Sequence, residues 1–126
     1  MTENKKEYTI LITDDEKSNL LVLGETLSPS YNILMAKSGA RALELAAAHT
    51  PDLILLDVLM PEMSGFEAIV RLKESAVTDK IPVIFITGLS DADSEEKGLS
   101  LGAVDYIVKP FNQAIVKARV KNHINY

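Results

Sequence analysis

The chain has 126 residues, of which 47% are hydrophobic and 25% are charged, and its formal net charge at pH 7 is -5. This length suits one ordinary domain with a hydrophobic core, and the composition is near the average of globular proteins, which excludes disordered and fibrous classes. The negative net charge argues against direct binding to nucleic acid, because such binding depends on lysine and arginine neutralising phosphates.

In chain order we expect a strand at 8–12, a helix at 17–27, a strand at 31–35, a helix at 39–48, a strand at 53–56, a helix at 66–74, a strand at 81–86, a helix at 91–101, a strand at 103–108 and a helix at 111–122. The strands are short apolar runs, whereas the helices carry apolar residues at three- and four-residue spacing. In the first helix the apolar residues at near-helical spacing are Leu20, Leu21, Leu23 and Leu27, and in the second an apolar stripe is expected from Ala40, Leu43 and Ala47. The helix at 91–101 contains Gly98, which lowers helix propensity, and we expect it to be the most mobile helix.

Strict alternation of strand and helix predicts a parallel sheet covered by helices on both faces. We therefore expect a flavodoxin-like, doubly wound α/β fold with five strands, whose order 2-1-3-4-5 is assigned by analogy with other such folds. One domain is expected over residues 1–126, with its core at about 7–124.

Asp57 directly follows Leu53-Ile54-Leu55-Leu56, the most apolar strand, which suits burial on both faces of the sheet. One interpretation makes Asp57 the cap of the following turn, and the other makes it a functional residue at the strand's carboxyl end, where open α/β sheets bind ligands. The other strands decide between them, because polar residues also follow these strands: Asp14 and Asp15, Thr87, and Lys109.

Carboxylates brought together at one sheet edge repel one another unless a cation is bound between them. Oxygen ligands without cysteine favour a hard ion, so we expect Mg²⁺, for which Mn²⁺ can substitute. A nearby lysine and threonine would bind the oxygens of a phosphoryl group.

These residues lie in motifs that resemble the receiver domain of two-component response regulators. The motifs are Asp14-Asp15, Leu55-Leu56-Asp57-Val58-Leu59-Met60-Pro61 with Gly65, Ile86-Thr87-Gly88, and Tyr106-Ile107-Val108-Lys109-Pro110-Phe111. The resemblance covers residues 7–124. It implies a domain that catalyses its own phosphorylation and dephosphorylation rather than a conventional turnover enzyme.

The resemblance implies that Asp57 accepts a phosphoryl group from a phosphohistidine. Asp15, Asp57 and the backbone carbonyl of Leu59 would bind Mg²⁺ directly, while Asp14 would act mainly through a metal-bound water.

The remaining roles carried over from the family concern binding and switching. Thr87 and Lys109 would each bind a phosphoryl oxygen, and the peptide bond between Lys109 and Pro110 would be cis. Thr87 and Tyr106 would move inward on phosphorylation and reshape the face formed by the fourth helix, fifth strand and fifth helix. The alternative for Tyr106 is an ordinary strand aromatic packed at the surface.

Positions two residues after Asp57 and Thr87 tune the lifetime of the acyl phosphate in this family. Here they are Leu59 and Leu89, neither of which can orient the hydrolytic water, so we expect slow self-dephosphorylation.

Three other functions are alternatives to this one. A magnesium phosphohydrolase of the haloacid dehalogenase type needs a second acid at the position of Leu59, and a flavodoxin-like nucleotide module would have its phosphate repelled by residues 13–16. A receiver-like module that only binds proteins, without being phosphorylated, remains the main alternative.

Several other residues are expected to have structural roles. His49 and His123 each stand alone near a helix end, and Met60 and Met63 are expected to pack beside the Asp57 turn. Glu16 is expected in the first turn of a helix, with contact to a metal-bound water as the alternative.

The expected partners are a sensor histidine kinase or histidine phosphotransfer protein, an output domain or downstream protein, and a second copy of the phosphorylated chain. No membrane is expected among them, because no apolar run is long enough to span one and residues 1–8 do not resemble a signal peptide, so we expect a cytoplasmic protein. Residues 111–120 resemble receivers that continue into a cyclic-di-GMP enzyme or a hybrid kinase, so we favour a receiver excised from a longer regulator.

Overall fold

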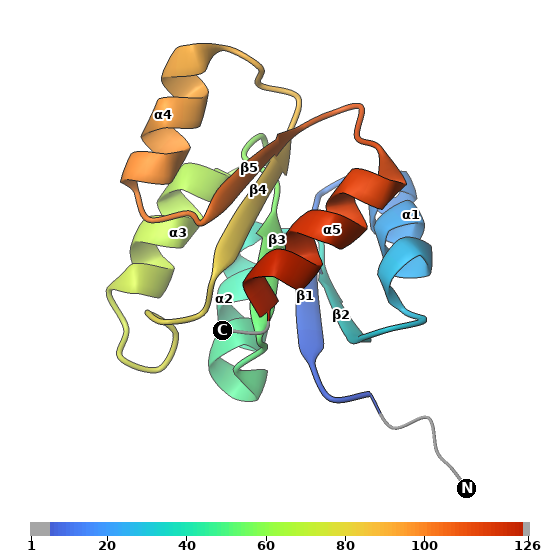
Figure 1. Ribbon diagram of the computed structural model, residues 1–126. Coiled ribbons are helices and arrows are strands. Elements are labelled where there is room, and N and C mark those ends of the chain that lie inside the picture. The colour runs from blue at the N-terminus through green and yellow to red at the C-terminus, as the bar shows by residue number, and fades with distance from the viewer. Residues whose placement is uncertain (1–5, 125–126) are drawn as a thin grey trace, which may run out of the picture.

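The computed structural model describes residues 6–124, in which five strands alternate with five helices (Figure 1). The strands are β1 (Thr9–Thr13), β2 (Asn32–Ala36), β3 (Leu53–Leu56), β4 (Val83–Thr87) and β5 (Asp105–Val108). The helices are α1 (Lys17–Leu27), α2 (Gly39–His49), α3 (Gly65–Lys73), α4 (Ala92–Ser100) and α5 (Gln113–Ile124). No boundary differs from its predicted position by more than two residues, which confirms the order and type of the elements.

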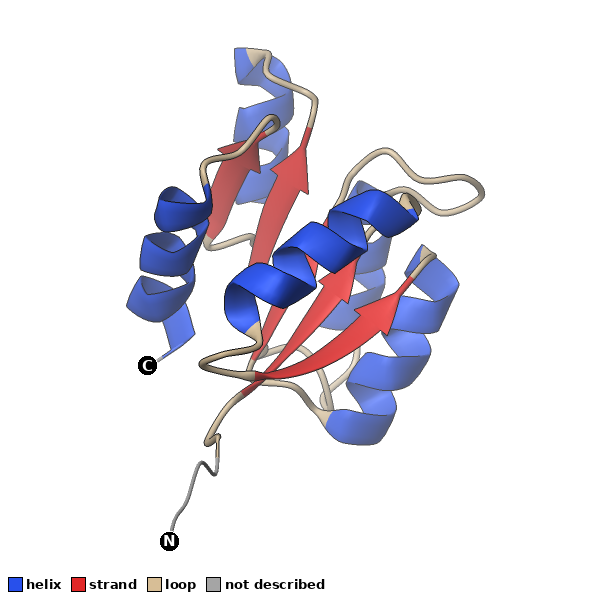
Figure 2. Cartoon of the chain, turned by 90° about the vertical axis from the view of Figure 1, so that its right-hand side faces the viewer, coloured by secondary structure: helices blue, strands red, loops and turns tan. Residues whose placement is uncertain are grey.

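The strands form one parallel sheet in the order β2-β1-β3-β4-β5, which confirms the doubly wound, flavodoxin-like topology. Figure 2 shows all the arrows pointing the same way, so every strand ends at the same edge of the sheet. β1 lies between β2 and β3, and its last residue, Thr13, is in register with Leu56 at the end of β3. The segments that follow β1 and β3 therefore emerge side by side.

Alternate side chains of β3 pack into two different hydrophobic clusters. Leu53 and Leu55 face α1 and α5, whereas Ile54 and Leu56 face α2 and α3. All four are 0–1% exposed, as expected for a strand buried on both faces. Each such side chain contributes about 1.5–3 kcal/mol through burial, so β3 is a rigid support for the residue that follows it.

The predicted packing faces of two helices were wrong in part. Leu21 on α1 is 51% exposed, although Leu20 and Leu23 are buried as expected. On α2, Ala40 and Ala47 are exposed, and the buried positions are Gly39, Ala42, Leu45 and Ala46, with Leu43 partly buried. An alanine-rich helix offers little contrast in hydrophobicity between its faces, so spacing alone does not identify the buried one.

Gly98 has a packing role that the sequence did not suggest. It is buried in α4, and a Cβ atom at this position would lie 3.0 Å from the Phe85 ring and 3.1 Å from the Tyr106 ring. The missing side chain therefore allows α4 to lie close to β4 and β5. That α4 is the most mobile helix remains a prediction.

Candidate functional site

Five polar residues named from the sequence lie at the carboxyl edge of the sheet. Asp14 and Asp15 follow β1, Asp57 follows β3, Thr87 ends β4, and Lys109 follows β5. The sheet order places β3 between β1 and β4, so residues far apart in the sequence converge around Asp57. This edge is the upper one in Figure 1, where the connections to the helices begin.

The three aspartates form a cluster that suits a metal ion. One carboxylate oxygen from each lies within 4.8 Å of the others. Asp14 is 1% exposed and Asp57 is 5% exposed, whereas Asp15 is exposed and opens the cluster to solvent. A donor set made only of oxygens selects a hard cation such as Mg²⁺, which also retains several waters.

Lys109 is the cation that already contacts this cluster. Its Nζ atom lies 2.7 Å from Oδ2 of Asp14 and 3.2 Å from Oδ2 of Asp57. Burial lowers the pKa of Lys109, but the hydrogen bond to Asp14 and the charges of Asp57 and Asp14 outweigh burial, so the net shift of its pKa is upward. The ammonium group therefore stays charged at neutral pH.

One lysine does not neutralise three carboxylates. Burial is the largest cause of a raised pKa at Asp57; the charge of Asp14 adds to it, and Lys109 opposes it without cancelling it. Three negative charges and one positive charge leave an excess of two negative charges in a largely buried site. A divalent cation would balance that excess, so the residues present fit Mg²⁺.

The backbone around Asp57 is held from two sides. Its N–H donates to the carbonyl of Thr13 at 3.0 Å, and the N–H of Gly65 donates to the carbonyl of Val58 at 2.9 Å. A Cβ atom at Gly65 would overlap the carbonyl oxygen of Asp57, so only glycine allows α3 to begin this close to the turn. The N–H of Leu59 also donates to Oδ1 of Asp57 at 3.3 Å.

The peptide bond between Lys109 and Pro110 is cis, which is the geometry that the resemblance implies for it. The N–H of Lys109 donates to the carbonyl of Thr87 at 2.8 Å, which ties the end of β5 to the end of β4. The Lys109 side chain therefore starts from a fixed backbone position.

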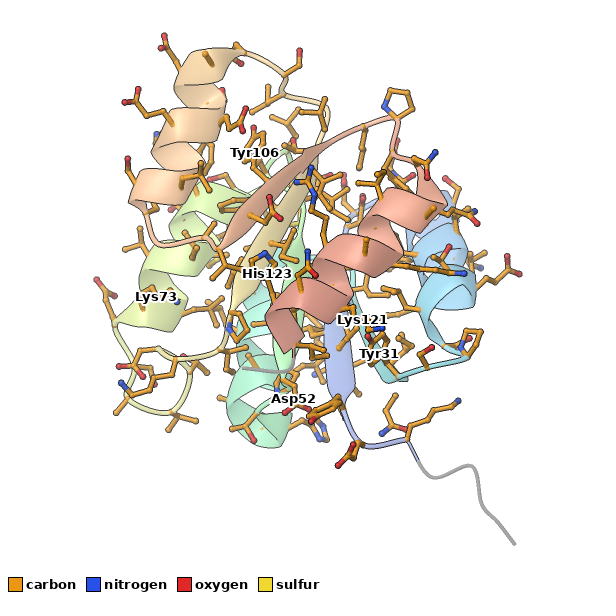
Figure 3. The ribbon with its side chains drawn as sticks, viewed as in Figure 1. Tyr31, Asp52, Lys73, Tyr106, Lys121 and His123 are labelled. Atoms are coloured by element: carbon orange, nitrogen blue, oxygen red, sulfur yellow. The ribbon has the colours of Figure 1, made fainter. Side chains whose placement is uncertain are left out.

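Tyr106 is 5% exposed and does not pack at the surface as the alternative interpretation supposed. Its hydroxyl donates to the carbonyl of Leu89 at 2.9 Å, and the N–H of Leu89 donates to Oγ1 of Thr87 at 3.3 Å. Figure 3 shows Tyr106 between β5 and α4, toward the edge that carries the aspartates. Burial, together with the charges of acidic neighbours, raises the pKa of Tyr106.

Leu59 and Leu89 line one apolar pocket beside the Asp57 turn. Leu59 is 57% exposed and Leu89 is partly buried. Met60 also lines this pocket, and both Met60 and Met63 pack against the hydrophobic cluster below, as predicted. Neither leucine offers a polar atom on its side chain to a water molecule approaching Asp57.

The histidines differ in their surroundings. His49 is exposed at the end of α2. The prediction that His123 stands alone was wrong, because its Nε2 atom lies 3.2 Å from Oδ2 of Asp105, whose Oδ1 atom also accepts from Arg119 at 2.8 Å. Arg119 and His123 share one face of α5 at four-residue spacing, a signal that could have indicated a common partner. Figure 3 shows His123 on α5.

Glu16 does not reach the aspartates through its side chain in the described structure. Its Oε1 atom accepts from Asn19 at 2.8 Å, and its N–H donates to Oδ1 of Asp14 at 3.0 Å. It therefore helps to begin α1 and to orient Asp14, as its predicted place in the first turn suggested.

Comparison with known proteins identifies the family of this chain. The family model of the response regulator receiver domain matches residues 10–121. A probable cyclic di-GMP phosphodiesterase of Vibrio cholerae is 45% identical over 122 residues, which are 97% of this chain and 28% of that protein. A histidine kinase of Formosa agariphila is 43% identical over 118 residues, 94% of this chain and 9% of the kinase. The chain thus spans less than a third of these curated relatives.

Solved structures agree in fold. A putative response regulator from Chloroflexus aurantiacus superimposes with a TM-score of 0.90 at 31% identity, covering 96% of this chain and all of the other. The receiver domain of a sensor histidine kinase from Pseudomonas aeruginosa, solved with a magnesium ion in its active site cleft, gives a TM-score of 0.87 at 25% identity over 94% of this chain and 98% of the other. No helix of the described residues is long and apolar enough to cross a membrane. The chain belongs to the family of response regulator receiver domains of two-component signalling.

Proposed function

We propose that this receiver accepts a phosphoryl group on Asp57 from the phosphohistidine of a sensor kinase or of a histidine phosphotransfer protein. The observation that carries the proposal is the meeting of three aspartates and Lys109 at one sheet edge, with Asp57 directly after the fully buried strand β3. The carboxylate of Asp57 forms the new P–O bond as the P–N bond of phosphohistidine breaks, and the imidazole leaves with its electron pair and takes up a proton.

Asp14, Asp15, Asp57 and the backbone carbonyl of Leu59 are the groups that would hold Mg²⁺ or Mn²⁺. The bound ion would neutralise charge on the phosphoryl oxygens during transfer. Lys109 contributes a positive charge that is already in contact with Asp57, and the Thr87 hydroxyl supplies a hydrogen bond. The protein's task in such a transfer is positioning and electrostatic stabilisation.

Leu59 and Leu89 make the acyl phosphate long-lived in this proposal, because neither side chain can orient a hydrolytic water. A half-life measured in Mg²⁺ would test this, with wild type compared to Leu59→Asn combined with Leu89→Glu. We expect the double variant to lose phosphate at least several-fold faster. A wild-type lifetime of seconds that the double variant leaves unchanged would refute the role of the leucines.

Phosphorylation is proposed to act through Thr87 and Tyr106 on the face formed by α4, β5 and α5. The long curated relatives support a receiver that controls an output region of the same polypeptide, since this chain matches only 28% and 9% of two of them. The same face is proposed to pair two phosphorylated copies. Gel filtration with beryllofluoride tests pairing: a larger species is expected, and a monomer at high concentration counts against it.

Incubation with acetyl phosphate and Mg²⁺ tests the proposed function. Intact-mass spectrometry should show one added phosphoryl group in wild type, and none in EDTA or in Asp57→Asn. The absence of any mass increase would favour the alternative, a receiver-like module that only binds proteins. Continuous release of phosphate from small phosphate esters would favour a phosphohydrolase. Such an enzyme needs an acidic residue at position 59, where this chain has leucine.

A further inference from the structure

The middle of the turn between Asp57 and α3, residues 59–63, is held in place mainly by side-chain packing. Its ends are fixed by the hydrogen bonds of Asp57 and Gly65, but Leu59, Pro61 and Glu62 are exposed. The side chains that pack this stretch onto the hydrophobic cluster are Met60 and Met63, both partly buried. Val58, just before Leu59, is also buried in this cluster, so the position of the Leu59 carbonyl, a proposed metal ligand, depends on Val58 on one side and on the packing of these methionines on the other.

Met63 is seated against Gly39, the first residue of α2. A Cβ atom at position 39 would lie 2.9 Å from Sδ of Met63 and 3.1 Å from both its Cγ and Cβ atoms. The first turn of α2 is itself fixed, because the N-cap Ser38 accepts from the N–H of Arg41 at 3.1 Å. At Gly39 the α2 backbone carries no side chain, and Met63 packs directly against it.

We propose that Gly39 is a positioning residue for the phosphoacceptor site. Because Gly39 has no side chain, Met63 packs directly on α2 and holds the Asp57 turn in the position that the metal ligands require. This inference rests on the proposed function. It assigns to α2, which contributes no ligand, a role in setting the Leu59 carbonyl relative to the three aspartates.

The size of the effect follows from the contacts. Carbon atoms pack optimally at about 3.5–4.0 Å, so a methyl group at position 39 is too close to Met63 by several tenths of an ångström. Rotation of the thioether end relieves only the Sδ contact, since Cβ and Cγ are at the root of the side chain. The turn itself must move. Mg²⁺ requires near-ideal octahedral geometry, and loss of a group that orients its ligands typically weakens metal binding by about 10–100-fold.

Since this displacement is smaller than loss of a group, we expect Gly39→Ala to weaken Mg²⁺ binding by roughly fivefold. Gly24→Ala is the matched control, because it also adds a methyl to a helix against a methionine. That methyl would lie 2.5 Å from Cε of Met35, but Cε is the free end of a side chain that is 40% exposed and can turn away. Gly24→Ala should keep the wild-type affinity.

The experiment is a double-mutant cycle of Gly39→Ala and Met63→Ala, read by calorimetric titration with Mg²⁺ and by urea unfolding. Each single variant should weaken binding, and the double variant should bind better than the product of the two losses predicts, because Met63→Ala removes the Sδ and Cγ atoms and leaves only the Cβ contact at 3.1 Å. Hydrogen exchange in EDTA should show faster exchange of the amides at positions 59, 60, 62 and 63 in both single variants.

The outcomes separate the two proposals. If wild type does not bind Mg²⁺, the proposed function fails. If wild type binds Mg²⁺ but Gly39→Ala binds equally well, or if the two losses are simply multiplied in the double variant, the role of Gly39 is refuted. Weaker binding in Gly39→Ala and Gly24→Ala alike would show a general effect of stability and would also refute it.

Discussion

Replacing Lys109 by methionine removes the one cation that contacts the buried carboxylates of the described site. Methionine keeps an unbranched apolar stem, so packing changes little while the charge is lost. Asp14 and Asp57 then lie close together without a positively charged partner, and their side chains are only 2% and 7% exposed. The folded protein without metal should be less stable.

The magnitude follows from the two contacts of Lys109, 2.7 Å to Asp14 and 3.2 Å to Asp57. Removing one partner of a buried ion pair typically costs about 3–5 kcal/mol. The Lys109 side chain is 19% exposed, so water can partly replace it. We therefore expect Lys109→Met to lower the free energy of unfolding by about 2–3 kcal/mol in EDTA, a large part of the roughly 5–15 kcal/mol of an ordinary domain.

Urea unfolding in EDTA and in Mg²⁺ measures this. Because the ammonium group no longer competes with the metal, Mg²⁺ should stabilise Lys109→Met more than it stabilises wild type. Asp14→Asn in the same chain should restore part of the loss, and the exposed Lys117→Met serves as the control. A loss below 0.5 kcal/mol, or equal stabilisation of both proteins by Mg²⁺, would refute the electrostatic account.

Three other outcomes are expected. Oγ1 of Thr13 is buried and has no hydrogen-bond partner among the described residues. Thr13→Val should therefore raise the free energy of unfolding by about 1 kcal/mol. A lower free energy of unfolding in urea titration would contradict this. The pKa of Tyr106 is raised in the folded protein, so the free energy of unfolding of wild type should fall as pH rises above the ordinary tyrosine pKa of 10.0. Tyr106→Phe should lose less over the same range. Parallel plots of unfolding free energy against pH between pH 8 and 11 would count against burial as the cause. In Gly65→Ala the added methyl meets backbone atoms that cannot rotate away, so the free energy of unfolding should fall by about 3 kcal/mol. Gly88→Ala adds a Cβ with no atom within 4 Å and should be nearly neutral in the same urea assay.

The elements at the site could be predicted from the sequence because their signals are local. The run before Asp57 has the length and composition of a strand buried on two faces, and the residues after the other strands are polar. Parallel strands bring those residues to one edge whatever the order of the strands. The neighbourhood of Asp14 and Asp57 required the order 2-1-3-4-5, which came from analogy and which the structure confirms.

The contacts that position the site could not be predicted in this way, because they form between residues that are distant in the sequence and lie close only in the folded chain. Gly39 and Gly65 look like ordinary helix-start glycines in the sequence, and only the tertiary structure shows that one faces Met63 and the other the carbonyl of Asp57. The pairing of Asp105 with His123 also joins distant segments, although the four-residue spacing of Arg119 and His123 was a signal that could have indicated it. The buried face of α2 was misplaced because its alanines differ too little from one another.

Asp57, among three neighbouring aspartates, is the residue that we propose takes the phosphoryl group. An aspartyl phosphate is reduced by borohydride to homoserine, whereas a free carboxylate is not. After incubation with acetyl phosphate and Mg²⁺, reduction and peptide sequencing by mass spectrometry should show homoserine at position 57 alone. Homoserine at position 14 or 15, or no homoserine in a sample that retains its fold, would contradict the account.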